Sequence, residues 1–551
     1  MLLGIDVGGT HTDAVLIGDR GIESTFKAKT DTQNLLHTVT TALKEVTSGI
    51  DVKKITNINL STTLSTNAII ENKLEKTALF ISSGPGIDPE NFKIGSNTYI
   101  IDGSINHRGS EVLKLDSSSL DKSIKNCSKE KIKVFAAVTK FSTRNSIQES
   151  AIAESLKGHA DFITEGHNLS SQLSFPRRAA TAYYNSAVWR IYSNFLASIM
   201  KALKGMGIDA PVNILKADGG TMPAEVSKNL PVESILSGPA ASIMGIIALS
   251  KITEDSVILD IGGTTTDIAV FASGAPLMER DGISLGGIPT LVRSLQNRSI
   301  GIGGDSVITV VNGEVRTGPE RRGANAAEGG EYPALVDALN VAGIILHQNK
   351  DKSVEAIKNL AEKNGMAPSA IADAAIAYSV KKITDETNKL LSEINQKPVY
   401  TIHEMIYGKK IVPKKIYIIG GPAAALAKVM KGDTDIIVPE NYSVANAIGA
   451  ALARTTFETE LFSDTGKEKM VIPNLGIEEK VSRRYSLSEA EHDVIAYTRK
   501  YLENSGYNDK NLNIDIVESS SFRMIDDYYA SGNDIRVKCQ IRPGVIMNFH
   551  K

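Results

Sequence analysis

Two near-identical eight-residue strings constrain this chain more than any other feature. The chain reads DVGGTHTD at residues 6–13 and DIGGTTTD at residues 260–267. Six of the eight positions carry the same residue in both copies. Chance repetition of this kind is expected on the order of once in ten thousand chains of ordinary composition. The repeat therefore indicates a structural unit that is used twice.

Each copy lies between two short apolar runs. Residues 2–5 precede the first copy and residues 14–17 follow it, while residues 256–259 and 268–271 flank the second. Apolar runs on either side of Gly-Gly-Thr predict a strand, a tight turn and a second strand. The turn of an ordinary hairpin explains the glycines. It does not explain why both copies also share Asp and Thr residues at the same positions. We therefore predict two hairpins that bind a ligand.

The shared glycines and threonines are suited to binding phosphate groups. Glycine lets the backbone approach a ligand that a Cβ atom would block. Successive backbone N–H groups in such a turn form a concave anion site, and threonine hydroxyls add further donors. The predicted phosphate-binding residues are Gly8, Gly9, Thr10 and Thr12 in the first hairpin and Gly262, Gly263, Thr264 and Thr266 in the second.

The carboxylates at the edges of both hairpins predict a metal ion. A carboxylate beside a phosphate is repelled by about 4 kcal/mol per charge pair at an effective dielectric near 20, unless a cation lies between them. The expected arrangement is therefore a nucleotide with Mg²⁺ between the two hairpins. Asp6 and Asp260, each near the end of a strand, are the predicted ligands. Asp13 and Asp267 either join the metal or cap the hairpins, and the sequence leaves both roles open.

Length and charge favour a large enzyme in the cytoplasm. At about 150 residues per domain, the 551 residues allow two to four domains. A net charge of −2 without a long basic run argues against nucleic acid and membrane surfaces as partners. The longest apolar stretch, residues 240–250, is too short to span a bilayer, and the first residues read as a strand rather than a signal peptide. Cys127 and Cys539 are solitary, which favours a reducing compartment.

The order of predicted strands and helices divides the chain into three domains. Residues 1–185 form a first lobe with the first hairpin, and residues 186–460 form a second lobe with the second hairpin and a helical insert. Residues 461–551 form a small appended domain. Within the second lobe we predict a strand at residues 415–419, followed by the loop GGPAAA and, later, by the helix SVANAIGAALAR.

The two hairpins, this loop and this helix together resemble the superfamily of sugar kinases, Hsp70 chaperones and actin. The resemblance implies an α/β class, with a two-lobed, duplicated ribonuclease H-like ATPase fold and here a small C-terminal α+β domain. It also implies ATP as the nucleotide, with the loop at Gly420 and Gly421 approaching the adenosine. The Ala- and Gly-rich helix is expected to pack closely at the interface between the lobes.

Further strings resemble the A-type subunits of the hydantoinase/oxoprolinase family over most of the chain. These strings include LSTTLSTNAIIE from residue 60, INHRGSEV from residue 105, FSTRNSIQE from residue 141 and PVESILSGPAASIMG from residue 231. They occur in the family's order and spacing. The string GIGGDS corresponds to the family's Gly-rich loop, so Gly303 and Gly304 are expected near the nucleotide.

The family resemblance implies an activity. Cyclic amides such as hydantoins and 5-oxoproline are poor electrophiles, and the family uses ATP to phosphorylate the carbonyl oxygen before water attacks. Many members work with a B-type partner subunit, and we also expect an oligomer. Alternatives are an ATP-dependent ketone carboxylase subunit, a small-molecule kinase, and a chaperone-like or filament-forming ATPase.

Candidate substrate residues are less strongly indicated. Thr62, Thr63 and Asn67 are suited to hydrogen-bonding a carbonyl or phosphate group, although capping of a following helix explains them equally well. His107 and Arg108 are suited to an anionic substrate group, although a surface loop also uses such a pair for solubility.

Two further residues are candidates for catalysis. His167 and Asp218 are expected to meet either as metal ligands or as a base and its orienting group, unless His167 is structural. His11 in the first hairpin is expected to face solvent, because its counterpart in the second hairpin is Thr265.

Overall fold

The first hairpin is built into a six-stranded sheet. The computed structural model describes residues 1–31, 34–279, 281–396, 410–430, 432, 434–507, 512–526 and 529–550. In spatial order the strands are β3 (Gly21–Lys29), β2 (His11–Gly18), β1 (Leu2–Val7), β4 (Asn57–Thr62), β11 (Val212–Leu215) and β12 (Thr221–Pro223). Strands β3 and β2 are antiparallel to their neighbours, whereas β1, β4 and β11 are parallel to one another.

A second sheet repeats this arrangement around the second hairpin. The strands are β15 (Ala275–Pro276) and β20 (Asn297–Ile300) at one edge, then β14 (Thr266–Ala272), β13 (Ser256–Ile261), β23 (Lys415–Ile419) and β24 (Asp435–Ile437). Strand β20 is antiparallel to β14, and β14 is antiparallel to β13. Strands β13, β23 and β24 are parallel to one another. The duplicated α/β fold predicted from the repeat is confirmed, and so is the predicted strand at residues 415–419.

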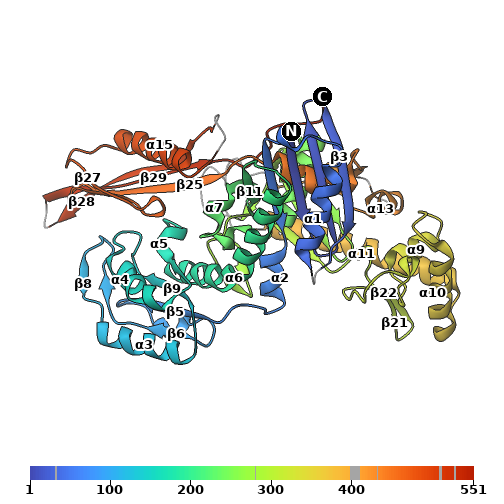
Figure 1. Cartoon of the computed structure of the whole chain (residues 1–551), viewed down its shortest axis with the longest axis horizontal. Helices are drawn as coiled ribbons and strands as arrows, with labels where there is room; N and C mark the ends of the chain where they lie inside the picture. The colour runs from blue at the N-terminus through green and yellow to red at the C-terminus, as the bar shows by residue number, and fades with distance from the viewer. Residues whose placement is uncertain are drawn as a thin grey trace.

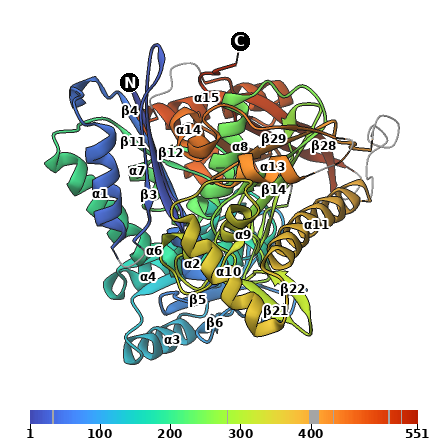
Figure 2. The same ribbon diagram turned by 90° about the vertical axis from the view of Figure 1, so that its right-hand side faces the viewer.

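Helices form layers between and outside the two sheets, as Figure 2 shows. Between the sheets, α14 (Ala445–Leu452) packs on β1 and β2, while α8 (Ser237–Leu249) packs on β13 and β23. The outer face of the first sheet is covered by α1 (Leu35–Val46) and α6 (Phe175–Gly205). The outer face of the second sheet is covered by α9 (Leu335–Val341), α11 (Pro368–Asn395) and α13 (Ala423–Val429).

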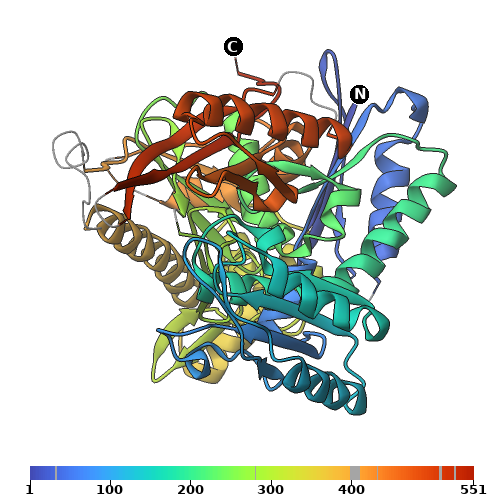
Figure 3. The ribbon, with the colours of Figure 1, turned by 90° about the vertical axis from the view of Figure 1, so that its left-hand side faces the viewer.

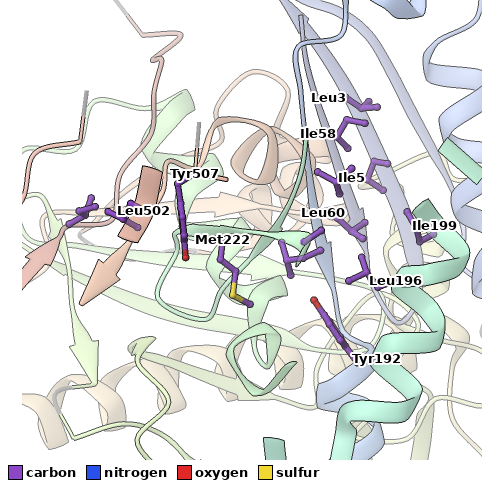
Figure 4. Packing of buried hydrophobic residues seen from close by; sticks show 14 of the residues in the cluster. Leu3, Ile5, Ile58, Leu60, Tyr192, Leu196, Ile199, Met222, Leu502 and Tyr507 are labelled. Atoms are coloured by element: carbon purple, nitrogen blue, oxygen red, sulfur yellow. The ribbon is translucent and has the colours of Figure 1, made fainter. Parts of the chain in front are cut away.

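The core of the first lobe joins its sheet to α6. Figure 4 shows Leu3 and Ile5 of β1 beside Ile58 and Leu60 of β4, with Leu196 of α6 facing them. Each of these side chains is almost fully buried. Burial of a large aliphatic side chain contributes about 1.5–3 kcal/mol, so this core holds β1 and the hairpin that follows it firmly in place.

The two helices between the sheets cross at unusually short range. A Cβ atom on Gly449 of α14 would lie 1.9 Å from the Ala241 carbonyl oxygen, and one on Gly245 of α8 would lie 2.1 Å from the Ala445 carbonyl oxygen. A Cβ atom on Gly4 of β1 would lie 2.2 Å from the Ala447 carbonyl oxygen. The close packing predicted for the Ala- and Gly-rich helix is confirmed.

A smaller parallel sheet lies at the lower left of Figure 1, below the C-terminal region and to the left of the hairpin sheet. Its apolar residues contact α3 and α4 on one face and α6 on the other. The elements are β6 (Thr98–Ile100), β5 (Thr77–Ser82), β9 (Val134–Thr139) and β10 (Phe162–Glu165), with α3 (Ser117–Lys129) and α4 (Ile147–Leu156).

The last part of the chain forms a five-stranded antiparallel sheet covered by α15 (Leu487–Asn504), seen in red in Figure 3. The strands are β27 (Ile477–Lys480), β26 (Lys469–Ile472), β25 (Phe457–Asp464), β29 (Tyr529–Ile541) and β28 (Asp515–Asp526). The predicted α+β character of this region is confirmed.

The predicted domain limits can be placed on these elements. The limit at residue 185 lies within α6, and the first sheet takes β11 and β12 from beyond it. The limit at residue 460 lies within β25. The division into three domains stays a prediction.

Shorter elements connect these parts. They include α2 (Leu64–Ile70), β7 (Ser104–Ile105), β8 (Glu111–Leu113), α5 (Gly166–Leu169), α7 (Ala224–Ser227), the β21–β22 hairpin (Ile308–Val311 and Glu314–Thr317) and α10 (Lys350–Asn364). Within the described ranges, none of the helices combines the length and the apolar character needed to cross a membrane.

Candidate nucleotide and metal site

The two repeated strings form matching turns. In the first hairpin the Gly8 amide donates to the His11 carbonyl oxygen at 3.0 Å, and in the second the Gly262 amide donates to Thr265 at 2.9 Å. Asp6 lies opposite Asp13 across the first hairpin. The same register places Asp260 opposite Asp267 in the second.

The tips of the two hairpins meet. The Thr10 and Thr264 hydroxyl oxygens lie 3.1 Å apart, although the residues are separated by 254 positions. A Cβ atom on Gly263 would lie 2.7 Å from Cγ2 of Thr10. The structure therefore brings the two predicted phosphate-binding turns together from opposite lobes.

Two Gly-rich loops pack on the second hairpin. The amide of Gly304 donates to the Gly262 carbonyl oxygen at 2.9 Å. A Cβ atom on Gly303 would lie 2.6 Å from the Gly263 carbonyl carbon, and one on Gly420 would lie 2.8 Å from Oδ1 of Asp260. Gly420 also has a φ of +93°, a conformation that favours glycine. Both predicted loops, with Gly421 next to Gly420, therefore lie beside the turn of the second hairpin.

Asp6 and Asp260 share one buried environment, and their exposed fractions are 4% and 7%. Asn446, at the start of α14, donates to Oδ2 of Asp260 at 3.2 Å and also hydrogen-bonds to Asp6. Oδ2 of Asp260 accepts a hydrogen bond from the Ser242 hydroxyl as well. Oδ1 of Asp6 is buried and has no hydrogen-bond partner.

Burial dominates the electrostatics of Asp6 and Asp267. Burial raises the pKa of Asp6 to about 7, with a hydrogen bond from Ser61 opposing this shift and repulsion from Asp13 and Asp260 adding to it. Burial and the charge of Asp260 also raise the pKa of Asp267 to about 7. A cation in this environment would favour the ionised carboxylates.

Asp13 differs from Asp6 because it already has a cation. Its Oδ1 atom lies 2.9 Å from Nζ of Lys27 on β3. Lys27 therefore compensates the charge of Asp13, whereas the unpartnered Oδ1 atom of Asp6 is available to a ligand.

The carboxylate pair fits Mg²⁺. This ion is commonly held by one or two carboxylates together with phosphate oxygens and water. Asp6 and Asp260 are two carboxylates of this kind, and the buried, unpartnered Oδ1 atom of Asp6 is an unused ligand. Among the described residues there is no group of three or more His, Cys, Asp or Glu side chains arranged for a metal.

The remaining hairpin threonines bond within the protein. The Thr12 hydroxyl lies 3.0 Å from that of Thr30, and the Thr266 hydroxyl donates to the Ile302 carbonyl oxygen at 2.6 Å. Both threonines are fully buried. The structure thus places their hydroxyls where they hold the hairpins in shape.

Thr62, Thr63 and Asn67 lie next to the first hairpin. The Thr63 hydroxyl donates to the Val7 carbonyl oxygen at 3.2 Å, and a Cβ atom on Gly9 would lie 3.9 Å from Nδ2 of Asn67. Thr63 is the N-cap residue of α2 but makes no side-chain capping hydrogen bond. The Thr62 hydroxyl accepts from the amide of Leu64, the first residue of α2, at 3.2 Å, so the substrate role and the capping role both stay predictions.

His107 and Arg108 lie elsewhere. The Arg108 guanidinium contacts both carboxylate oxygens of Asp464 at the end of β25, with Nε at 3.0 Å and Nη2 at 3.3 Å. His107 is exposed. Figure 1 shows β8, which follows this loop, on the left of the molecule, whereas β3 of the hairpin sheet lies on the right. The structure does not bring this pair to the turns of the two hairpins, because the Arg108 ion pair joins it to the C-terminal sheet.

His167 and Asp218 have separate partners. Nδ1 of His167 lies 2.6 Å from Oε1 of Glu149. Oδ2 of Asp218 lies 3.3 Å from Nζ of Lys216, and both oxygens of Asp218 accept from the Thr456 hydroxyl at 2.9 Å. No hydrogen bond or ion pair joins His167 to Asp218, because each is held by a partner on a different element, and their catalytic roles stay predictions.

The electrostatics of the two sites also differ. Burial alone lowers the pKa of His167, but the bond to Glu149 raises it above its ordinary value. Burial alone raises the pKa of Asp218, but Lys216 and Arg293 hold it below its ordinary value. Both side chains therefore favour their charged forms.

His11 is half-buried rather than facing solvent. Burial lowers the pKa of His11 to about 4, and the charge of Lys27 adds to this shift. The imidazole is therefore neutral at physiological pH.

Four residues of this site were not predicted from the sequence: Ser242, Asp305, Asn446 and Lys27. Asp305 lies in the predicted Gly-rich loop, and a Cβ atom on Gly263 would lie 2.8 Å from its Oδ2 atom. Asn446 is the polar residue within the apolar string ANAIGAAL, which is a signal that sequence reading can use. Ser242 carries no such signal, because only the tertiary fold brings it to Asp260. Lys27 lies directly opposite Asp13 across the local β2–β3 hairpin.

The duplicated sheets and the facing hairpins define a class: a two-lobed α/β protein with a fold of the sugar kinase, Hsp70 and actin type. Residues 2–160 match the model of the hydantoinase/oxoprolinase N-terminal region, and residues 178–459 match the hydantoinase/oxoprolinase model. The chain belongs to the hydantoinase/oxoprolinase family, as the sequence resemblance predicted.

Related sequences and structures agree with this placement. Caprolactamase subunit alpha of Pseudomonas jessenii is 24% identical over 511 residues, which cover 83% of this chain and 70% of the relative. The 5-oxoprolinase of Saccharomyces cerevisiae is 22% identical over 319 residues, covering 54% of this chain and 24% of the relative.

Two solved structures share the fold. A nucleotide-free structure of acetone carboxylase, an enzyme of ATP-dependent acetone carboxylation, aligns with a TM-score of 0.71 at 16% identity, covering 99% of this chain and 88% of that chain. The ATP-dependent caprolactamase of Pseudomonas jessenii aligns with a TM-score of 0.68 at 19% identity, covering 98% and 87%.

Proposed function

We propose that this protein is an ATP-dependent hydrolase of a cyclic amide of the hydantoin, 5-oxoproline or lactam type. Its membership of the hydantoinase/oxoprolinase family supports this proposal. Relatives named caprolactamase and 5-oxoprolinase, both of which are named for cyclic amides, support it further.

The observation that carries the proposal is the contact between the Thr10 and Thr264 hydroxyls at 3.1 Å. A triphosphate bound here would exchange this hydroxyl contact for bonds to its own oxygens. Backbone amides of both turns would then surround the transferred phosphoryl group from two sides, and such preorganised donors stabilise charge as it develops.

The chemistry has three steps. The amide carbonyl oxygen attacks the γ-phosphorus of ATP, ADP leaves and the ring nitrogen loses its proton, which gives an O-phosphorylated imidate. Water then adds to the imidate carbon and the C–N bond of the ring breaks, which gives a free amine and an acyl phosphate. A second water attacks the acyl carbon, and inorganic phosphate leaves with the former carbonyl oxygen. The products are an amino acid or ureido acid, ADP and phosphate.

Residues of this chain are assigned to these steps. Glycines 8, 9, 262 and 263 and the Thr10 and Thr264 hydroxyls bind the phosphates, and Thr62, Thr63 and Asn67 orient the amide beside the first hairpin. Asp6 and Asp260 would hold Mg²⁺, which neutralises phosphate charge when it is bound. The Gly420 and Gly421 loop would contact the adenosine.

The partners and location remain proposals. The word "subunit" in the name of the caprolactamase relative supports a B-type partner subunit for this chain. We also propose an oligomeric assembly in the cytoplasm.

The test is ATP hydrolysis with a panel of cyclic amides: a hydantoin, 5-oxoproline and caprolactam. One member should increase ADP release severalfold in the wild type. Asp6→Asn with Asp260→Asn should abolish the increase, whereas the control Asp19→Asn, at an exposed turn, should retain it. If ring opening needs a B-type subunit, ADP release should still depend on the amide after that subunit is added.

Other outcomes would favour other functions. Release of a stable phosphorylated product would indicate a small-molecule kinase. Turnover that no amide changes, accompanied by polymerisation, would indicate a filament-forming ATPase and contradict the proposal.

A ketone carboxylase subunit is the second candidate, because the acetone carboxylase structure aligns over 99% of this chain. A carboxylase would require both a ketone and bicarbonate for ADP release. A hydrolase would require neither, so one assay separates the two.

A further inference from the structure

A small cavity lies at the carboxyl ends of the parallel strands β9 and β10, apart from the hairpins. It has a volume of about 180 Å³ and is bounded by residues 142–146, by His167 and by residues 471–478 of the C-terminal sheet. Residues 142–146 follow the end of β9, and His167 follows the end of β10. Ligands of parallel α/β sheets bind at this edge, because the loops there diverge. Figure 3 shows the C-terminal sheet directly above this edge of the α/β region.

Three residues that line the cavity each carry a buried polar atom without a hydrogen-bond partner. Ser142, Thr143 and Arg144 have exposed fractions of 2%, 1% and 4%. Their Oγ, Oγ1 and Nε atoms are buried without a hydrogen bond. A buried polar atom left unpaired costs about 1–3 kcal/mol, so three in succession along one loop indicate that a ligand completes the site.

Arg144 gives the cavity positive charge. Its guanidinium stacks on the Phe462 ring, 3.2 Å from the ring centroid, which fixes its orientation. Burial lowers the pKa of Arg144 to about 10, so the group stays cationic at neutral pH. Among the described residues, no carboxylate lies within ion-pair distance of it. Glu478 on the rim pairs with Lys469 at 2.8 Å instead.

His167 adds a second donor to the lining of the cavity. Its Nδ1 atom is bonded to Glu149 at 2.6 Å, so Nε2 is the ring nitrogen left for a ligand. Glu149 is fully buried and also accepts from the Thr139 amide at 2.8 Å, which fixes the carboxylate. The imidazole is therefore held in one orientation.

We propose that this cavity binds a small oxyanion, a carboxylate or a phosphate, between Arg144, Ser142, Thr143 and His167. The volume of about 180 Å³ is well below the ~300–1,000 Å³ of drug-sized ligand pockets and fits a small anion only. The site is separate from the phosphate-binding hairpins, because α4, α5 and β27 lie left of centre in Figure 1 and the hairpin sheet lies to the right. The proposal therefore stands independently of the proposed catalytic function.

The test is direct binding of acetate, bicarbonate and inorganic phosphate to the whole protein, measured by calorimetry. The variants are Ser142→Ala and Thr143→Val, each of which removes one hydroxyl while nearly keeping the volume. Each variant should raise the Kd of the anion about tenfold or more, because a hydrogen bond to a charged group is lost. The comparison of acetate and bicarbonate with phosphate identifies the type of anion that the site prefers.

Thr459→Val is the matched control. Thr459 is also buried, at 1% exposure, with an unpartnered hydroxyl, but it does not line the cavity. This variant should leave the anion affinity unchanged. Thr143→Val should raise the unfolding temperature of the free protein, because it removes an unsatisfied buried hydroxyl, and should gain less from added anion than the wild type does.

Two results would overturn the proposal. One is the absence of saturable binding of all three anions at millimolar concentrations. The other is binding that Ser142→Ala and Thr143→Val leave unchanged while both proteins remain folded, which would place the anion elsewhere.

Discussion

The Thr10 and Thr264 hydroxyl oxygens lie 3.1 Å apart at the point where the two lobes meet. Each belongs to one copy of the repeated string, so the duplication in the sequence becomes a pair of facing turns in the structure. The contact requires the close approach at Gly263, where a Cβ atom would lie 2.7 Å from Thr10.

Gly263→Ala should therefore weaken nucleotide binding. The added methyl group presses on Thr10 of one lobe and Asp305 of the other, at 2.7 and 2.8 Å, and forces the turns apart. We expect the Kd for Mg-ATP to rise about tenfold or more, as for other overpacked sites that cost 1–3 kcal/mol. Gly205→Ala, at a glycine whose Cβ position is open, should leave the Kd unchanged.

Asp6→Asn should change how stability depends on pH. Because burial raises the pKa of Asp6 from 3.8 to about 7, the folded protein holds a proton that the unfolded chain releases. The stability from this group is full below about pH 4 and is lost as pH rises through about 7.

At pH 8 without nucleotide, Asp6→Asn should therefore unfold with a free energy larger by about 2–4 kcal/mol than the wild type. The same variant should lose the stabilisation that Mg-ATP gives the wild type. Denaturant titrations at pH 5 and pH 8, with and without Mg-ATP, measure both effects. An equal pH dependence in variant and wild type would contradict the assignment of a buried, metal-binding carboxylate.

Gly449→Ala should destabilise the junction between the lobes. Its Cβ atom would lie 1.9 Å from the Ala241 carbonyl oxygen on α8, so the two helices must separate. Overpacking of this kind costs about 3 kcal/mol or more. Thermal unfolding measures the loss, with Gly205→Ala again as the control. A variant as stable as the wild type would mean that the helices do not cross this closely.

The Arg108–Asp464 pair should couple the loop after β7 to the C-terminal sheet. The Asp464 side chain is 3% exposed, so Asp464→Asn removes the charge of a buried ion-pair partner. We expect Asp464→Asn to cost about 1–3 kcal/mol in unfolding free energy. A double-mutant cycle with Arg108→Gln should give a coupling of about 1 kcal/mol, and additive effects would show that the pair contributes nothing.

Local patterns predicted the hairpins and much of the fold. The register of Asp6 against Asp13 and of Asp260 against Asp267 follows from the Gly-Gly-Thr turn and the apolar runs beside it. The close packing at Gly449 follows from a helix with little side-chain volume on one face. These features depend on neighbours in sequence, which periodicity and turn chemistry describe.

The surroundings of the candidate substrate residues were not predictable in the same way. Arg108 contacts Asp464 across 356 positions, and Asn446 reaches Asp260 across 186 positions. Such pairs arise when separate sheets pack, and a single sequence carries no pattern that specifies them. The sequence makes His167 a candidate for catalysis, but only the fold shows that it lies with Arg144 at the small cavity beside the C-terminal sheet.

The most direct measurement follows the carbonyl oxygen of whichever cyclic amide stimulates ADP release. The amide is labelled with heavy oxygen at its carbonyl, and the inorganic phosphate from a single turnover is analysed by mass spectrometry. Phosphorylation of the carbonyl oxygen at the facing hairpins predicts one labelled oxygen in each phosphate released. Unlabelled phosphate would show that ATP is hydrolysed by water and would contradict the proposed mechanism.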